Sequence, residues 1–210
     1  MDKEGEAARL DSIPFIKGRF AKSQPRHLEL AIENTTFDGP WLEFGVWKGT
    51  TARLLIDRLP WGGRLSLFDS FQGLPEDRKD GFPKGRFLLP ESQRPRFSDR
   101  RVELVEGFFE EALPDWARTR SEPAAFLFID CDLYSSTRTV LFNLHHLIVP
   151  GTVIVFDEFF VPELEKDEMS ALLEYAREYD VEYDYLARAQ NGSVSLVVSR
   201  SGGRPPALAT

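Results

Sequence analysis

The chain of 210 residues has one cysteine, Cys131, and so lacks a partner for an internal disulfide. Disulfide frameworks are typical of secreted domains, and nothing in the cysteine content indicates an oxidising compartment. No apolar run approaches the ~20 residues that a helix needs to cross a bilayer. The first residues, Met1 to Ala7, are charged and lack the apolar stretch of a signal peptide. We therefore expect a cytoplasmic protein without a membrane partner.

Positive charge is also scarce. The sequence has 26 Lys and Arg residues against 34 Asp and Glu residues, which gives a formal net charge of -8. Because nucleic-acid binding depends on a strong basic face that neutralises phosphates, this balance argues against a nucleic-acid partner. With 42% hydrophobic and 29% charged residues, the composition is that of an ordinary globular protein. The length fits one α/β domain.

Short apolar runs that read as strands alternate with segments that read as helices. The expected strands are residues 41–46, 64–68, 102–105, 124–130 and 152–156. This alternation predicts an open, mostly parallel sheet with helices on both faces. Two further runs, at 183–188 and 193–199, are joined through Asn191-Gly192 and predict a C-terminal antiparallel hairpin. The expected fold is therefore α/β with a seven-stranded sheet.

We expect three parts along the chain. Residues 1–38 form a helical lead, in which a helix begins at Pro25 and packs on a sheet edge or covers the ligand site. Residues 39–200 form the main domain, and residues 201–210 a disordered tail. Within the main domain, the long polar stretch at 76–101 is either a solvated loop or a lid over a substrate.

Every predicted parallel strand ends in an acid or a glycine. Ligands of open α/β sheets bind at the carboxyl ends of the strands, so these residues are expected to meet. In chain order they are Glu43 and Gly45, Asp69, Gly107, Asp130 and Asp132, and Asp157 and Glu158. Five such endings together predict one site.

The first strand turns into a helix through two glycines, Gly45 and Gly49. Glu43 stands where a dinucleotide-binding motif begins with glycine, and its charge would repel a diphosphate but suits an ammonium group. Asp69 lies 20 residues after Gly49, a spacing at which a carboxylate accepts hydrogen bonds from ribose hydroxyls. A ligand with an ammonium group, a ribose and no phosphate is S-adenosylmethionine.

The predicted cofactor site extends to the neighbours of these residues. Phe108 either packs in the core or, because it follows Gly107, flanks an adenine, and Trp47 and Phe71 likewise either line the pocket or pack in the core. The full expected set is Glu43, Phe44, Gly45, Val46, Trp47, Gly49, Thr50, Asp69, Ser70, Phe71, Gly107, Phe108 and Asp130.

Four blocks of the sequence resemble the macrocin O-methyltransferase family. They are residues 42–49 (LEFGVWKG), 68–75 (FDSFQGLP), 129–137 (IDCDLYSST) and 155–158 (VFDE), in the order of that family. The resemblance implies a class I methyltransferase fold, which is Rossmann-like, with S-adenosylmethionine as methyl donor. It also implies a divalent metal, usually magnesium, and a small-molecule acceptor that is methylated on a hydroxyl of a sugar or glycosylated natural product.

The acids at the fourth and fifth strands suit a hard cation. Asp130, Asp157 and Glu158 form an all-carboxylate set of the kind that binds magnesium. In the family the matching positions bind the metal, and the acid matching Asp130 is also a candidate base, so Asp130 is the predicted catalytic residue. A metal would lower the pKa of a bound hydroxyl and align it with the donor. Asp132 is either a further ligand or the cap of the next helix.

The leading hypothesis is a metal-dependent O-methyltransferase that acts on a sugar-like hydroxyl. Alternatives are a methyltransferase for an aromatic diol or an amine, and a subunit that binds S-adenosylmethionine without turnover. The intact set of acids argues against the last. His145 and His146 lie well inside a predicted helix, and we expect them to pack or face solvent. The sequence leaves open whether the chain forms a homo-oligomer.

Overall fold

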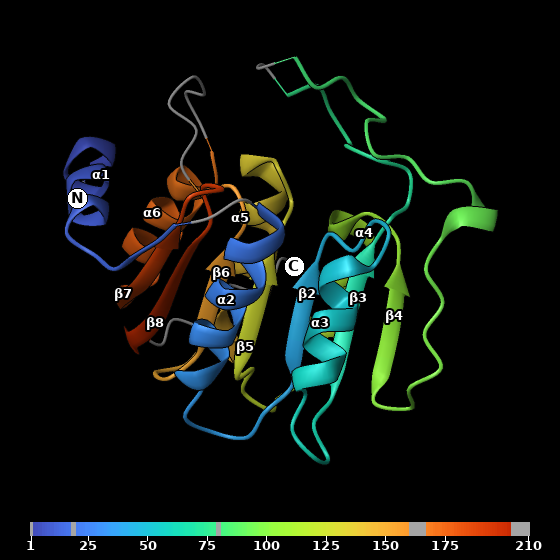
Figure 1. Cartoon of the computed structure of the whole chain (residues 1–210), viewed down its shortest axis with the longest axis horizontal. Coiled ribbons are helices and arrows are strands. Elements are labelled where there is room, and N and C mark those ends of the chain that lie inside the picture. Colours follow the sequence, from blue (N-terminus) through green and yellow to red (C-terminus); the bar gives the residue numbers. More distant parts are fainter. Residues whose placement is uncertain (1, 18–19, 79–80, 160–166, 203–210) are drawn as a thin grey trace, which may run out of the picture.

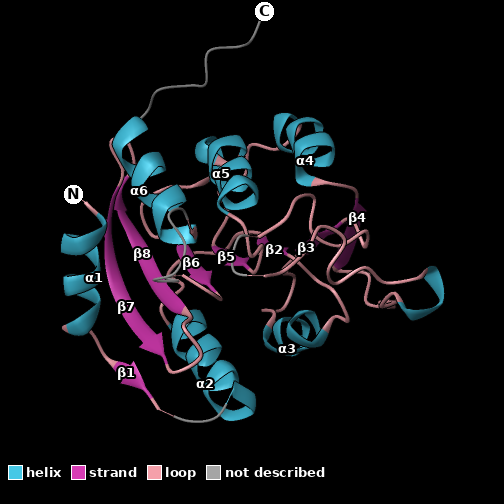
Figure 2. Ribbon diagram, turned by 90° about the horizontal axis from the view of Figure 1, so that it is seen from above, coloured by secondary structure: helices cyan, strands magenta, loops and turns pink. Residues whose placement is uncertain are grey.

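The computed structural model describes residues 2–17, 20–78, 81–159 and 167–202, which form a central sheet with helices on both faces (Figures 1 and 2). The strands are β1 (Phe15–Ile16), β2 (Trp41–Phe44), β3 (Leu65–Asp69), β4 (Val102–Glu106), β5 (Phe126–Ile129), β6 (Val153–Phe156), β7 (Glu182–Ala189) and β8 (Val194–Arg200). The helices are α1 (Lys3–Asp11), α2 (Phe20–Glu33), α3 (Thr50–Arg58), α4 (Phe109–Arg118), α5 (Tyr134–Asn143) and α6 (Glu168–Glu178), with short 3-10 turns η1 (Glu91–Gln93) and η2 (His145–Leu147).

The strand order is β1-β7-β8-β6-β5-β2-β3-β4. Strands β2 to β6 run parallel, and β8 is antiparallel to both β6 and β7. The predicted α/β sheet with a C-terminal antiparallel hairpin is thereby confirmed. The described sheet has one strand more than predicted, because β1 pairs parallel with β7 at the edge. A strand of two residues has no periodicity that a sequence could reveal.

The central strands bury side chains on both faces of the sheet. In β5, Leu127 and Ile129 belong to one core cluster, whereas Phe126 and Phe128 belong to the other. Figure 2 shows α4, α5 and α6 on one side of the sheet and α2 and α3 on the other. This explains the continuous apolar run in β5, since a strand covered on both faces does not alternate between apolar and polar residues.

The N-terminal lead packs at the hairpin side of the sheet. Helix α1 lies beside α6 and the outer hairpin strand (Figure 2). Helix α2 packs against β6, β7 and β8. It begins at Phe20 rather than at the predicted Pro25, so the proline lies inside the helix and removes one hydrogen bond there. The tail predicted at 201–210 lies outside the described residues from residue 203 onward.

A long loop connects β3 to β4, and its described parts, residues 70–78 and 81–101, extend above the carboxyl ends of the strands (Figure 1). Its backbone folds back on itself, with a hydrogen bond from Leu74 N to Arg86 O and one from Arg78 N to Phe82 O. The loop thus has local hairpin-like structure, and its role as a lid stays a prediction. No helix in the described ranges is long and apolar enough to span a membrane.

Candidate active site

A cavity of about 360 Å³ opens at the carboxyl ends of β2 to β6. This volume is in the range of small-molecule sites. Residues from all five predicted strand ends meet around it: the lining includes Gly45, Trp47, Asp69, Ser70, Gly107, Phe108, Asp130, Asp132, Asp157 and Glu158. The other predicted cofactor residues, which do not line this cavity, are Glu43, Phe44, Val46, Gly49, Thr50 and Phe71.

Gly45 allows the ends of β2 and β5 to come together. Its φ is +92°, and a Cβ atom at this position would lie 1.9 Å from the carbonyl oxygen of Asp130. Only glycine fits both the conformation and the contact. The Asp130 N–H donates to Phe44 O at 2.8 Å. The glycine turn and the predicted catalytic acid therefore share one wall of the cavity.

Asp69 organises the turn that follows β2. Its Oδ2 accepts the N–H groups of Val46 at 2.8 Å and Trp47 at 2.7 Å, and its Oδ1 accepts the N–H of Phe71 at 2.7 Å. A carboxylate has about four acceptor positions, so capacity remains for a ribose hydroxyl. The sequence spacing of Asp69 does not reveal that it accepts these three N–H groups, because the donors lie in turns whose backbone conformation the sequence does not predict.

Three residues that line the cavity have a left-handed backbone: Trp47 (φ 45°), Phe87 (φ 72°) and Asp132 (φ 62°). For residues other than glycine this conformation costs roughly 1–3 kcal/mol each, and it clusters at functional sites. The rings of Trp47 and Phe87 meet edge to face at 5.8 Å. They form an aromatic wall between the glycine turn and the loop that follows β3.

Glu43 lies beneath the glycine turn. It is fully buried, and neither carboxylate oxygen has a hydrogen-bond partner in the described part of the chain. Burial, reinforced by the charge of Asp69, holds the pKa of Glu43 well above its ordinary value. The predicted contact between Glu43 and an ammonium group stays a prediction, since Glu43 does not reach the cavity lining.

Asp130 faces the cavity from the end of β5. Within the described ranges, its carboxylate makes no hydrogen bond or ion pair. Burial raises the pKa of Asp130 well above its ordinary value, and the neighbouring carboxylates, with Asp157 foremost, raise it further. A carboxylate with these properties is suited to accept a proton.

Asp157 is held by two amide side chains. Its Oδ1 accepts from Gln24 Nε2 at 3.2 Å and from Asn191 Nδ2 at 3.4 Å. Burial raises the pKa of Asp157, while the bond from Gln24 opposes that effect. Gln24 and Asn191 come from α2 and the hairpin turn. The sequence contains no local signal that would have connected them to this acid.

Glu158 and Asp132 share one buried arginine, Arg78, from the loop that follows β3. Arg78 Nη1 lies 2.7 Å from Glu158 Oε2 and 2.8 Å from Asp132 Oδ1. The N-cap residue of α5 is Leu133, without a side-chain capping bond, so Asp132 does not take the predicted role of cap. Arg78 was missed because it lies 54 and 80 residues from these two acids in the sequence.

The described residues contain no group of three or more His, Cys, Asp or Glu side chains placed to hold a metal ion. Of the three predicted ligands, Glu158 is ion-paired with Arg78, and Asp157 accepts from two amides. Only Asp130 lacks such a protein partner in the described stretches. The predicted set of Asp130, Asp157 and Glu158 does not fit a metal ion as these side chains stand.

The two adjacent histidines take no part in the cavity. His145 stacks on Tyr179 at 3.8 Å between ring centroids, and its Nδ1 lies 3.0 Å from the hydroxyl of Tyr175. His146 contacts the backbone carbonyl of Ala117. The expectation that both histidines pack or face solvent is confirmed.

Residues 42–159 match a family described as "Methyltransferase domain". The chain belongs to this family. The match covers more than half of the sequence and includes the acids and glycines at all five parallel strand ends. The macrocin subtype within the methyltransferases stays a prediction.

Two curated relatives of this methyltransferase domain methylate natural products, according to their names. Demethyldecarbamoylnovobiocin O-methyltransferase from Streptomyces niveus is 27% identical over 73% of this chain and 64% of its own length. The 8-demethyl-8-(2,3-dimethoxy-alpha-L-rhamnosyl)-tetracenomycin-C 4'-O-methyltransferase from Streptomyces olivaceus is 28% identical over 64% of this chain and 59% of its own length. The chain therefore spans less than two thirds of each relative.

Solved structures share the fold. The calicheamicin methyltransferase CalS11 superposes with a TM-score of 0.66 at 22% identity and covers 86% of this chain and 80% of its own. The O-methyltransferase TomG from Streptomyces achromogenes, described in complex with SAM, gives a TM-score of 0.53 at 17% identity, over 84% of this chain and 79% of its own. The methyltransferase domain thus has the class I fold that the sequence predicted.

Proposed function

We propose that this methyltransferase domain transfers a methyl group from S-adenosylmethionine to a sugar hydroxyl of a glycosylated natural product. The observation that carries the proposal is the Asp130 carboxylate, which faces the cavity beside the glycine turn and has no partner in the described residues. A relative named for a rhamnosyl substrate supports the acceptor class. The complex of TomG with SAM supports the donor.

The β2 to β4 side of the cavity fits the donor. Gly45 keeps side-chain atoms away from the wall, Asp69 has a remaining acceptor position for a ribose hydroxyl, and Phe108 offers a ring to the adenine. When bound, S-adenosylmethionine would supply a methyl group that is activated by its positively charged sulfur.

Asp130 is the proposed general base. Its raised pKa brings proton affinity toward the range in which a base works at neutral pH. One carboxylate oxygen would take the proton of the acceptor hydroxyl while the hydroxyl oxygen forms its bond to the methyl carbon. The bond between that carbon and sulfur would break, its electron pair would stay on sulfur, and S-adenosylhomocysteine would leave. The backbone behind Asp130 is held in place, because the Cys131 N–H donates to the buried Glu168 Oε1 at 3.4 Å.

The divalent metal implied by the sequence is not part of this mechanism. Two of the three carboxylates that would hold it are already engaged, Glu158 by Arg78 and Asp157 by two amide side chains, so no step is assigned to it. Metal dependence stays a prediction of the family resemblance. Loss of transfer in excess chelator, with recovery on addition of magnesium, would establish it.

The test uses methyl-labelled S-adenosylmethionine with four acceptors: a glycosylated aglycone, the same aglycone without its sugar, an aromatic diol and an amine. We expect label only in the glycosylated compound. Label in the diol or the amine would favour the corresponding alternative acceptor. Cofactor binding by calorimetry without transfer to any acceptor would favour a binding subunit.

A further inference from the structure

The loop that follows β3 places a guanidinium group among the acids at the strand ends. Arg78 is 7% exposed and is ion-paired with both Glu158 and Asp132. A buried guanidinium is costly unless its charge and its N–H groups are matched. The pairing joins the loop to the ends of β5 and β6, which are the strands that carry Asp130 and Asp157.

The position of Arg78 is fixed by its own loop. Its backbone N–H donates to Phe82 O at 2.8 Å, and its guanidinium lies 4.4 Å from the centroid of the Phe82 ring. Glu76, two residues earlier, accepts from Ser135 Oγ of α5 at 2.6 Å. The guanidinium therefore arrives at the acids only when this part of the loop is folded and docked.

Arg78 forms an ion pair with Glu158, which the sequence analysis predicts to be a metal ligand. Because Glu158 Oε2 lies 2.7 Å from a guanidinium nitrogen, a divalent cation at this oxygen would have to compete with Arg78 and would be repelled by its charge. The cation would first have to displace Arg78 and open the loop. Because Arg78 belongs to the loop, its charge offsets that of Glu158 and Asp132 only while the loop is docked.

We infer that Arg78 is a positioning residue whose positive charge offsets the negative charge of the strand-end acids, which are Asp130, Asp132, Asp157 and Glu158. The same ion pairs hold the 70–101 loop over the cavity. Arg78 orients Glu158 and Asp132, and through them the acid side of the site. The inference rests on the proposed function only in taking this cavity as the site of methyl transfer. In this arrangement the guanidinium of Arg78 provides the positive charge that the sequence analysis assigned to a metal ion.

Direct binding of Mn²⁺, followed by electron paramagnetic resonance, tests the competition between Arg78 and a divalent cation. The proteins are the full chain, the Arg78→Met variant and a control, Arg96→Met, which removes an exposed arginine of the same loop. We expect Arg78→Met to bind Mn²⁺ at least about tenfold more tightly than wild type, because the acids lose their internal cation. Arg96→Met should match wild type.

Limited proteolysis tests the latch. Cleavage within 70–101 should be at least about tenfold faster in Arg78→Met, since local opening no longer breaks an ion pair. Arg78→Lys keeps the charge and should restore both protection and weak Mn²⁺ binding in part. If Arg78→Met fails to fold, the comparison of wild type with Arg78→Lys still tests the inference, because the lysine variant should bind Mn²⁺ more tightly and be cleaved faster than wild type.

Tight Mn²⁺ binding by wild type, with no gain in Arg78→Met, would overturn the inference. Equal proteolysis of the wild type and both Arg78 variants would overturn the latch. Neither measurement needs an acceptor or turnover. The inference can therefore fail while methyl transfer is observed, and it can hold where no transfer is found.

Discussion

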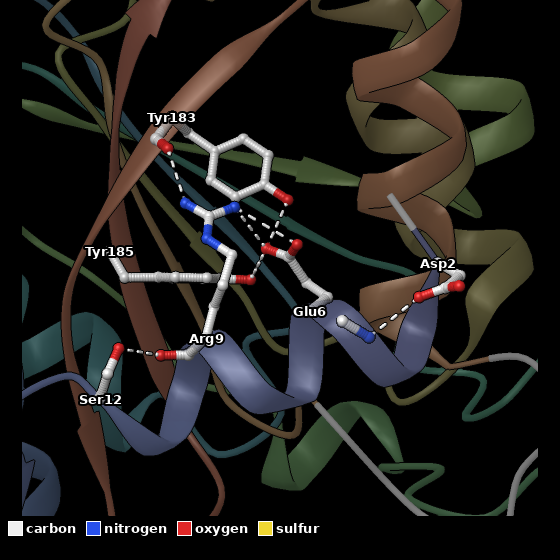
Figure 3. Close-up of polar contacts among 7 residues, drawn as sticks. Asp2, Glu6, Arg9, Ser12, Tyr183 and Tyr185 are labelled. Atoms are coloured by element: carbon white, nitrogen blue, oxygen red, sulfur yellow. Dashed lines mark hydrogen bonds and ion pairs between the residues drawn. The ribbon is translucent and has the colours of Figure 1, made fainter.

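Two acidic sites, Glu6 on α1 and the carboxylates at the carboxyl ends of β5 and β6, differ in how they are matched by hydrogen-bond donors. The side chain of Glu6 on α1 is fully buried, and its Oε1 accepts from the hydroxyls of Tyr183 at 2.9 Å and Tyr185 at 2.6 Å and from Arg9 at 3.0 Å (Figure 3). At the strand ends, Asp130 has no partner in the described chain, and its neighbours are mostly other acids.

The contrast separates a structural carboxylate from a functional one. A buried acid whose acceptor positions are filled fastens one element to another, as Glu6 fastens α1 to β7. An acid held near like charges has its ionisation made unfavourable, and such groups cluster where chemistry occurs. Substitution at Glu6 should therefore change stability, and substitution at Asp130 should change turnover.

Among these substitutions, Asp130→Asn is expected to have the largest effect, and that effect is on turnover. An amide cannot take the acceptor proton, so we expect kcat to fall by about 10²- to 10⁴-fold. The affinity for S-adenosylmethionine, measured by calorimetry, should stay close to that of wild type. Retained turnover in Asp130→Asn would contradict the assignment of Asp130 as general base. The strand-end acids would then have only an electrostatic role.

Asp69→Ala tests the donor side of the cavity. The variant loses three backbone N–H bonds along with the proposed contact to ribose, and we expect cofactor binding to weaken at least about tenfold. Asp99→Ala is the matched control, because Asp99 also accepts a backbone N–H, from Arg101, outside the cavity. Calorimetry that finds equal affinity for Asp69→Ala and wild type would contradict the donor assignment.

The sequence predicted those parts of the molecule that leave a local pattern. The run around Phe128 revealed a buried strand, and Asp69 and Asp130 were found because the carboxyl ends of parallel strands meet at one edge. These rules fix where a residue lies along the sheet. They do not fix which side chains from other elements approach it.

The missed residues are those whose role depends on distant contacts. Arg78 lies in a polar stretch for which the sequence left open a solvated loop, and Gln24 lies just before the predicted start of a helix whose position over the sheet was open. Glu6 belonged to a segment with no strong apolar face. In each case the partner is far away in the sequence, and only the packed structure brings the two together.

Glu6→Gln tests the structural side of the contrast. The amide presents N–H groups where three donors converge, so we expect the free energy of unfolding to fall by about 2 kcal/mol. Urea denaturation gives the value, with Glu4→Gln, an exposed position on the same helix, as control. Turnover should be unchanged under conditions where the variant is folded. A loss of kcat equal to that of Asp130→Asn would erase the distinction between the two groups.

The smallest expected effect is at His27, a buried titratable group whose two ring nitrogens both have hydrogen-bond partners. It is 1% exposed, and its two ring nitrogens lie 2.7 Å from Ser193 Oγ and 2.9 Å from Ser195 Oγ. Burial lowers the pKa of His27 from 6.5 to about 4. The unfolded chain therefore binds the proton first as the pH falls, and the stability that His27 contributes declines below pH 6.5.

Between pH 7 and pH 5.5 this decline should amount to about 1 kcal/mol, measured as the difference in unfolding free energy between wild type and His27→Gln. Asp130 and Asp157 have the opposite sign, because a carboxyl with a raised folded pKa binds its proton first in the native state, and the native state gains stability as the pH falls. His146→Gln, at an exposed site, should leave the wild-type slope intact. A His27→Gln slope equal to that of wild type would show that folding does not lower the pKa of His27, and would contradict the effect of burial on this residue.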